Sequence, residues 1–180
     1  AEIEGLIADA VRRGGHGQQV RIIAVTKTHG PDAVEAARQA GILDIGENKV
    51  QEALDKQDAL IGSPAAAAGL RWHLIGHLQR NKVKFLDRFA MLHALDSSRL
   101  ADAVHEFGSR RGRPVDALLQ VNVAGEETKG GFATADVGAE AERVRAMGGV
   151  RLAGVLTMAP FDAGERALGE VFAGARAARE

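Results

Sequence analysis

A lysine follows an apolar, β-rich stretch near the start of the chain. Residues 20–25 read VRIIAV, Lys27 comes two residues later, and residues 30–32 (GPD) are typical of a helix start. In a barrel of alternating strands and helices, side chains at the carboxyl ends of strands line the site of chemistry. A lysine amine placed there can form a Schiff base with an aldehyde once it has lost its proton, which burial favours. A surface lysine in a loop is the alternative interpretation, because most lysines are exposed.

Polar or small residues recur where other strands are expected to end. Asn48 follows the second expected strand and suits either a helix cap or a contact with a ligand. Gly76 and His77 follow the third, where a glycine lets the backbone come close to a ligand and the histidine offers polar lining. Met158 follows the sixth, although a methionine fills the core more often than it touches a cofactor. These residues are our candidate binding residues together with Lys27.

A metal site is not expected. His73 and His77 stand four residues apart, but that spacing puts two side chains on one face only in a helix. Here a strand runs into a glycine turn, and the HExxH pattern is absent.

In the fifth strand, Gln120 and Asn122 alternate with valines and therefore share one face, which needs polar partners or a ligand. Residues 126–132 after that strand read as a solvated turn, with a mobile lid as the alternative.

The elements that would carry these residues alternate along the chain. Strands are expected at 20–25, 42–45, 72–75, 91–94, 115–123 and 151–157, with helices at 2–13 and between and after the strands. Such alternation requires crossover connections, hence a parallel sheet covered by helices. An open doubly wound sheet and a TIM-type (β/α) barrel both fit. The phosphate-binding patterns GxGxxG and GxxxxGK[ST] are absent, which argues against a nucleotide-binding sheet.

Composition restricts the function classes further. The formal net charge is −1, which gives no electrostatic case for nucleic acid or for an anionic membrane surface. The chain has no cysteine, so disulfides and cysteine–zinc sites are excluded. The apolar runs are far too short for a membrane span, and no signal peptide opens the sequence. We therefore expect one cytoplasmic domain over residues 1–180 with a polar mouth suited to an aldehyde or a phosphate.

Six motifs carry a resemblance to a known family. In order along the chain they are AVTKTH, DIGENKVQE, WHLIGHLQRNK, HALDS, LLQVNVAGEETKGGF and LAGVLTMAP, and the match around them runs from about residue 2 to the end. They resemble the YggS/PROSC family of pyridoxal phosphate homeostasis proteins. The resemblance implies a barrel like the N-terminal domain of alanine racemase, a Schiff base between Lys27 and pyridoxal 5'-phosphate, and Asn48 beside the cofactor. It also implies a vitamin B6 carrier without a dedicated reaction, with pyridoxal-phosphate-dependent apoenzymes as possible recipients. We expect a monomer, and the frequent Ala, Gly and Arg residues indicate a bacterial source.

The chain departs from that family in two places. Lys49 stands where the family often has a tyrosine. The family's last two strands, with segments like SMGMS and RLGT that cradle the phosphate, have no counterpart, so only six of eight strand–helix units are evident. We therefore expect a single barrel domain lacking its C-terminal strands, with weaker cofactor binding than a full-length chain.

Other functions compete with a carrier. An amino-acid racemase on the same barrel would use a tyrosine as second base, and the sequence contains no tyrosine. A Schiff-base lyase such as an aldolase would need an acid or base beside the lysine, for which Glu47 is the one candidate. A pure interaction module is disfavoured, because polar residues gather at the ends of four expected strands, where barrels place binding sites.

Overall fold

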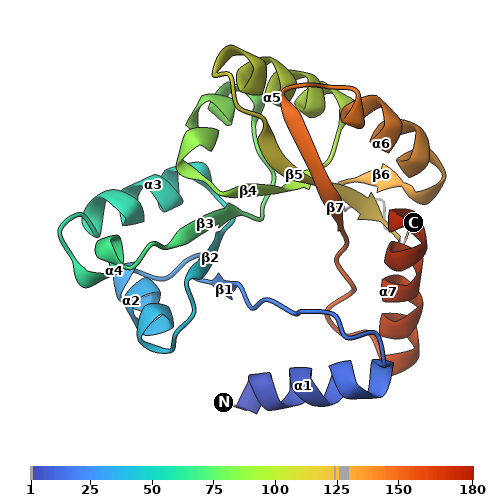
Figure 1. The fold of residues 1–180 in the computed structure, drawn as a ribbon, viewed down its shortest axis with the longest axis horizontal. Helices are drawn as coiled ribbons and strands as arrows, with labels where there is room; N and C mark the ends of the chain where they lie inside the picture. Colours follow the sequence, from blue (N-terminus) through green and yellow to red (C-terminus); the bar gives the residue numbers. More distant parts are fainter. Residues whose placement is uncertain (1, 124, 126–129) are drawn as a thin grey trace.

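The computed structural model describes residues 2–123, 125 and 130–180, and its centre is a curved parallel sheet (Figure 1). The strands are β1 (Ala24–Val25), β2 (Asp44–Glu47), β3 (Arg71–Leu74), β4 (Met91–Leu95), β5 (Val115–Asn122), β6 (Phe132–Ala133) and β7 (Val150–Leu156). Five pairings, β1–β2, β2–β3, β3–β4, β4–β5 and β5–β7, are parallel and follow chain order. The short β6 pairs with the carboxyl end of β5. In the described chain, β1 and β7 do not pair with each other.

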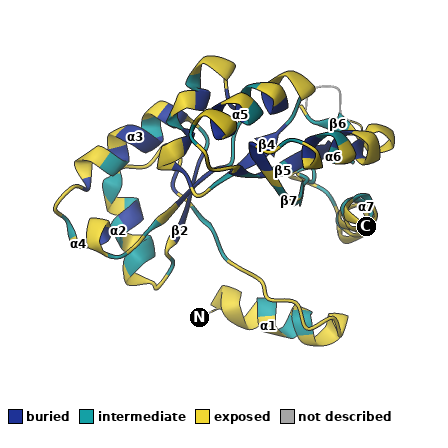
Figure 2. Ribbon diagram, turned by 45° about the horizontal axis from the view of Figure 1, so that its top comes forward, coloured by how far each residue is buried: buried dark blue, intermediate teal, exposed yellow. Residues whose placement is uncertain are grey.

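Helices precede, connect and follow the strands of this sheet. They are α1 (Glu2–Gly14), α2 (Pro31–Gln39), α3 (Val50–Ala59), α4 (Pro64–Ala67), η1 (Arg80–Arg88), α5 (Ser98–Arg110), η2 (Thr134–Asp136), α6 (Val137–Arg145) and α7 (Glu165–Arg179). Figure 2 shows α2, α3 and α5 buried on one side and exposed on the other, as amphipathic helices should be. Helix α1 has the expected amphipathic pattern, but none of its described residues is buried. The predicted alternation of six strand–helix units is confirmed.

Two strands differ in extent from the prediction. Regular pairing in the first strand covers only β1, because it has a partner on the β2 side alone. The second strand lies two residues later than expected, since Gly46 and Glu47 continue the ladder with β3 instead of starting a turn. Pairing with a neighbour has overridden the turn preference of glycine here. The shift places Asn48 at the very end of β2.

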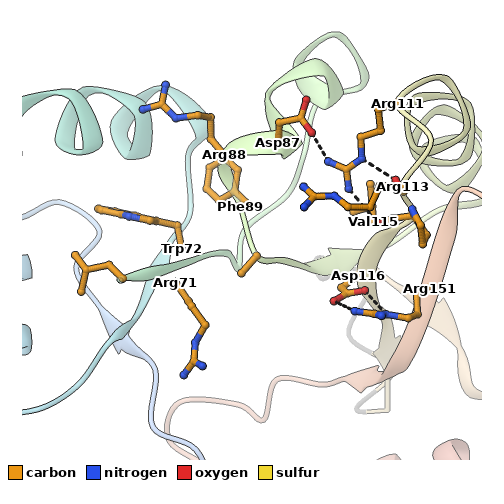
Figure 3. A pocket seen from close by; sticks show the side chains of 13 residues that line it. Arg71, Trp72, Asp87, Arg88, Phe89, Arg111, Arg113, Val115, Asp116 and Arg151 are labelled. Carbon is orange, nitrogen blue, oxygen red and sulfur yellow. Dashed lines mark hydrogen bonds and ion pairs between the residues drawn. The ribbon is translucent and has the colours of Figure 1, made fainter. Parts of the chain in front are cut away.

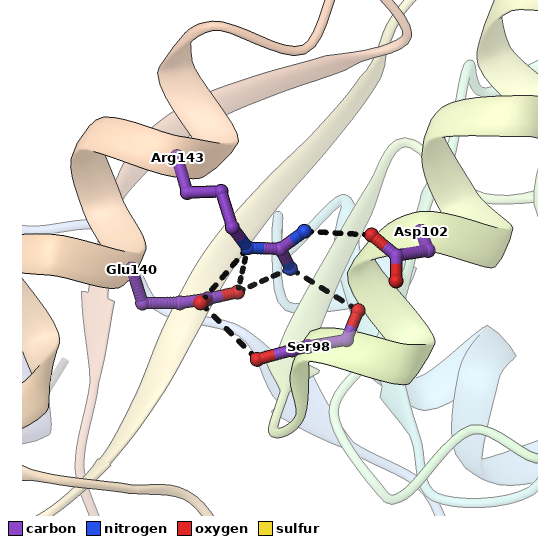
Figure 4. A network of polar contacts seen from close by, with 4 residues as sticks. All are labelled: Ser98, Asp102, Glu140 and Arg143. Carbon is purple, nitrogen blue, oxygen red and sulfur yellow. Dashed lines mark hydrogen bonds and ion pairs between the residues drawn. The ribbon is translucent and has the colours of Figure 1, made fainter.

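The hydrophobic core lies between the sheet and its helices. Its fully buried members include Val34, Ile45, Ala53, Leu74, Leu86, Leu92, Leu100, Val104, Leu119 and Val144. A polar link supplements it between α5 and α6 (Figure 4). The Arg143 guanidinium binds Glu140 on its own helix and reaches Asp102 at 2.7 Å and the Ser98 carbonyl at 3.2 Å on α5. This link fixes α5 and α6 relative to each other beside β5 and β7.

A row of polar side chains crosses the other face of the sheet. Successive residues of a strand point to opposite faces, so Asp44 lies on the side away from the helices if Glu47 faces α3. His73 Nε2 lies 2.8 Å from Asp44 Oδ1, and His73 Nδ1 lies 2.9 Å from His93 Nε2. Burial favours a raised pKa for Asp44, but hydrogen bonds from Arg71 and His73 outweigh it and lower that pKa. Burial, and then the charge of His73, lowers the pKa of His93 to about 4.

The buried His93 predicts an acid-dependent loss of stability. Its folded-state pKa of about 4 lies below the ordinary histidine value of 6.5, so the unfolded chain binds the additional proton between these pH values. The free energy of unfolding should therefore fall by up to about 1.4 kcal/mol per pH unit as the pH drops through this window. Urea denaturation at several pH values measures the slope. His93→Gln should lose this part of it, whereas the exposed His29→Gln should keep it; equal slopes in both variants would contradict the assignment.

Candidate functional site

A pocket of about 540 Å³ opens at the carboxyl ends of the strands. It is lined by Lys27, Asn48, Ile75, Gly76, His77, Asp96, Gln120, Gly130, Leu156 and Met158. The structure thus brings together all five residues that the sequence nominated, each from a different strand end except Gly76 and His77. We call this pocket the mouth. The role of these residues toward a cofactor stays a prediction.

Lys27 is exposed at the rim of the mouth, as most lysines are. It follows the edge strand β1, over which little of the described chain packs. Its position is nevertheless fixed by the preceding residue: Thr26 is buried, and its backbone N–H donates to the Gly46 carbonyl at 3.1 Å. The next residue, Thr28, has φ of 66°, which a β-branched side chain rarely adopts. Strain of this kind persists only where the surroundings impose it.

A buried ion pair imposes that turn. Lys56, on α3, is 5% exposed, and its Nζ lies 2.7 Å from Oε1 of the fully buried Glu47. The same ammonium donates to the Thr26 carbonyl at 2.7 Å and to Glu52 Oε1 at 2.9 Å. Glu52 in turn accepts the backbone N–H of Thr28, and the Thr26 hydroxyl donates to Glu47 at 2.5 Å. The lysine therefore ties the end of β1, the end of β2 and helix α3 to one point.

The charges in this cluster support one another. Burial by itself lowers the pKa of Lys56, but the hydrogen bonds that its ammonium donates to Glu47 and Glu52 outweigh burial and raise that pKa. The hydrogen bond from Lys56 is the main cause that lowers the pKa of the Glu52 carboxyl. Glu47 is enclosed in this cluster and is not part of the mouth lining. It is therefore not placed to act as the acid or base that a lyase would need beside Lys27.

Asn48 and Gly76 meet through their backbones. A Cβ on Gly76 would lie 2.4 Å from the Asn48 carbonyl oxygen, so a larger residue would displace the turn after β2. This contact requires a glycine even when no ligand is bound, whereas we expected the glycine to let a ligand approach the backbone. The alternative of a helix cap at Asn48 is wrong, because the cap position of α3 is Lys49 and no side chain caps it. Among the described residues, no hydrogen bond occupies the Asn48 amide, which lines the mouth.

His77 and Asp96 form a pair across the mouth. His77 Nδ1 lies 2.6 Å from Asp96 Oδ2, and the Asp96 side chain is only 10% exposed. Its other oxygen, Oδ1, is buried and has no hydrogen-bond partner in the described structure. Asp96 was not among the candidate binding residues. Its position directly after β4 was the signal that it belongs with the other strand-end residues.

Other polar residues have roles within the fold. The Gln120 amide donates to the Gly130 carbonyl at 2.6 Å and so closes one side of the mouth. His73 belongs to the interior polar row, while His77 turns to Asp96, so the two histidines do not converge. Within the part of the chain that the structure describes, no group of three or more His, Asp or Glu is arranged to hold a metal ion. Most of the loop considered as a turn or lid, residues 126–129, lies outside the described residues.

Comparison with known proteins adds to this geometry. The family model described as the N-terminal domain of alanine racemase matches residues 8–178. The pyridoxal phosphate homeostasis protein of Pseudomonas aeruginosa is 37% identical over 169 residues, covering 93% of this chain and 71% of that protein. Its counterpart in Aquifex aeolicus is 34% identical, covering 86% and 67%. The chain therefore belongs to the family of pyridoxal phosphate homeostasis proteins. It spans 64% of a third relative, from Synechocystis, at 32% identity.

Solved structures agree with the family and its fold. PipY of Synechococcus elongatus, in a structure with pyridoxal phosphate (PLP) bound, is 33% identical, with a TM-score of 0.81 over 94% of this chain and 77% of that one. Alanine racemase from Corynebacterium glutamicum, at 14% identity and a TM-score of 0.69 over 89% of this chain and 44% of that one, shares the fold. The predicted α/β fold of the alanine racemase N-terminal type is confirmed. No helix in the described ranges is long and apolar enough to cross a membrane.

The ion pair beneath the mouth gives a testable prediction. Lys56→Met would leave the carboxylate of Glu47 buried without its counter-ion, which should lower the free energy of unfolding by about 3–5 kcal/mol. Urea denaturation measures the loss, with the exposed neighbour Lys49→Met as the matched control. Adding Glu47→Gln to Lys56→Met should restore part of the stability, because the unpaired charge is then gone. A loss no larger than that of the control would show that the pair does not hold the turn.

Proposed function

We propose that this chain binds PLP in the mouth, with Lys27 as the residue that holds it covalently, and that it serves PLP homeostasis. The observation that carries the proposal is the convergence of Lys27, Asn48, Gly76, His77 and Met158 on one pocket. The family membership supports it, since the relatives are named for this role and PipY has PLP bound. We further propose that residues 1–180 act as one PLP-binding domain.

The residues present fit the reactive end of this cofactor. PLP supplies an aldehyde that condenses reversibly with a primary amine. Lys27 offers that amine at the rim, and the Asn48 amide offers both a donor and an acceptor beside it. The buried Oδ1 of Asp96 lacks a donor in the described structure, so a polar ligand group would satisfy it. Leu156, Ile75 and the Met158 side chain give the pocket its apolar wall.

We propose a carrier without a reaction of its own. Glu47, the acid or base suggested for a lyase, is enclosed with Lys56 beneath the mouth. The second base of a racemase on this barrel would be a tyrosine, which the sequence lacks. The exposure of Lys27 suits a carrier, because a recipient can reach the amine that holds the cofactor. We propose PLP-dependent apoenzymes as recipients, and a cytoplasmic monomer as the working form.

The role of Lys27 is tested by trapping the linkage. Protein incubated with PLP and reduced with borohydride should carry a stable adduct on Lys27, located by peptide mass spectrometry. Lys27→Ala should lose this adduct, whereas Lys49→Ala, which changes a nearby lysine outside the mouth lining, should keep it. An adduct that persists at the same level in Lys27→Ala, carried by other lysines, would refute the assignment.

The absence of a dedicated reaction is tested separately. With L- or D-alanine and added PLP, we expect interconversion no faster than with PLP alone, because the mouth lacks a tyrosine base. Chiral chromatography of the amino acid measures the rate. Turnover that exceeds the PLP background and disappears in Lys27→Ala would favour the racemase-like or lyase alternative. The proposal that Lys27 holds PLP would still stand in that case.

A further inference from the structure

A second hollow lies at the amino ends of the strands, opposite the mouth (Figure 3). Its volume is about 410 Å³, within the range of small-molecule sites. It is lined by Leu70, Arg71, Trp72, Asp87, Arg88, Phe89, Ala90, Arg111, Arg113, Pro114, Val115, Asp116 and Arg151. Five arginines and two aspartates thus line this hollow, in a chain whose formal net charge is −1. We call this feature the arginine hollow.

Three of the arginines are held by carboxylates or amides yet keep free donors. Arg71 binds Asp44, Arg151 binds Asp116, and Arg88 binds Gln57 and Asp58, in each case through Nε and Nη2. The Nη1 group of each guanidinium has no partner in the described chain. These pairs fix the guanidinium planes, and in Figure 3 the Arg71 and Arg88 guanidinium groups point away from Arg113, so they line the hollow with their stems.

The wall that carries Arg113 is rigid. Arg111 donates from Nε to the Arg113 carbonyl at 2.7 Å and from Nη2 to the Pro114 carbonyl at 3.0 Å. Its remaining nitrogen binds Asp87, and its guanidinium lies 5.1 Å from the centre of the Phe107 ring. This one side chain therefore ties the turn after α5 to the end of η1. The turn is held in place without using the Arg113 side chain.

Among the described residues, Arg113 is the one arginine of the hollow that has no carboxylate partner. Its side chain is exposed, has no ion-pair or hydrogen-bond partner among the described residues, and extends into the hollow in Figure 3. Leu70, Val115, Pro114 and the edges of Trp72 and Phe89 give the same hollow an apolar lining. An anionic group bound by guanidinium N–H donors, joined to a flat apolar body, matches this combination.

We propose that the arginine hollow binds a small organic phosphate, with Arg113 as the main contact to the phosphate. Guanidinium groups suit this ligand because their N–H pairs match phosphate oxygens in a bidentate geometry. A long polyanion such as nucleic acid matches the hollow less well, since the positive charge is confined to one concave site. The inference does not depend on PLP in the mouth, because the two sites lie at opposite ends of the sheet.

Titration calorimetry with AMP, inorganic phosphate and adenosine tests the proposal. AMP should bind more tightly than either of the other two probes, since each supplies only half of the ligand. Arg113→Glu should weaken AMP binding at least about tenfold, because it replaces the contact charge with a repulsive one. Arg110→Glu is the matched control: it makes the same charge change on an exposed arginine nearby that does not line the hollow. The Lys27→Ala chain should bind AMP as the unmodified chain does.

Four outcomes would overturn the proposal. They are no saturable AMP binding at millimolar concentration, adenosine or phosphate binding as tightly as AMP, equal losses in Arg113→Glu and Arg110→Glu, and loss of AMP binding in Lys27→Ala. The third would indicate diffuse electrostatic attraction, and the fourth would place the ligand in the mouth. Arg113→Gln, which removes the charge without adding repulsion, should give a smaller loss than Arg113→Glu in the same direction.

Discussion

The buried pair of Lys56 and Glu47 is the constraint on which the rest of the mouth depends. Both charges are removed from water, and each needs close partners because an unpaired buried charge would destabilise the fold. The partners are the ends of β1 and β2 and the first turns of α3. Lys27 and Asn48 directly follow the strand-end residues Thr26 and Glu47. The electrostatic requirement therefore sets where the candidate amine and the candidate amide stand.

A series of contacts continues from the end of β2 to the ends of the next strands. Glu47 fixes the end of β2, and the Asn48 backbone then packs so tightly on Gly76 that no side chain fits there. His77 follows directly and meets Asp96 after β4. Each contact joins neighbours in a parallel sheet, whose strands all end on the same side. The mouth is thus assembled by local contacts between consecutive units, although its residues are spread over more than a hundred positions of sequence.

The sequence predicted the features that depend on periodicity and chain order, and it missed those that depend on pairing in space. The alternation of strands and helices places Lys27, Asn48, Gly76, His77 and Met158 at strand ends, and parallel strands bring their ends together. Lys56 was missed because a lysine in an amphipathic helix is normally exposed, although it stands three residues after the buried Ala53. The limits of β2 were missed because its ladder with β3 overrides the turn preference of Gly46. Lys27 is exposed because β1 is an edge strand.

The distribution of unsatisfied groups separates the scaffold from the mouth. Two buried side-chain atoms in the described chain lack a hydrogen-bond partner: Glu47 Oε2 and Asp96 Oδ1. The first belongs to a carboxylate whose other oxygen is bound by Lys56 and by Thr26, so its group is largely compensated. The second belongs to Asp96, which lines the mouth and whose other oxygen is paired with the His77 ring alone, and leaving a buried acceptor without a donor costs about 1–3 kcal/mol. This oxygen, in the same pocket as an amine and a free amide, supports the proposal of a ligand in the mouth, because an N–H or O–H group of that ligand would supply the missing donor.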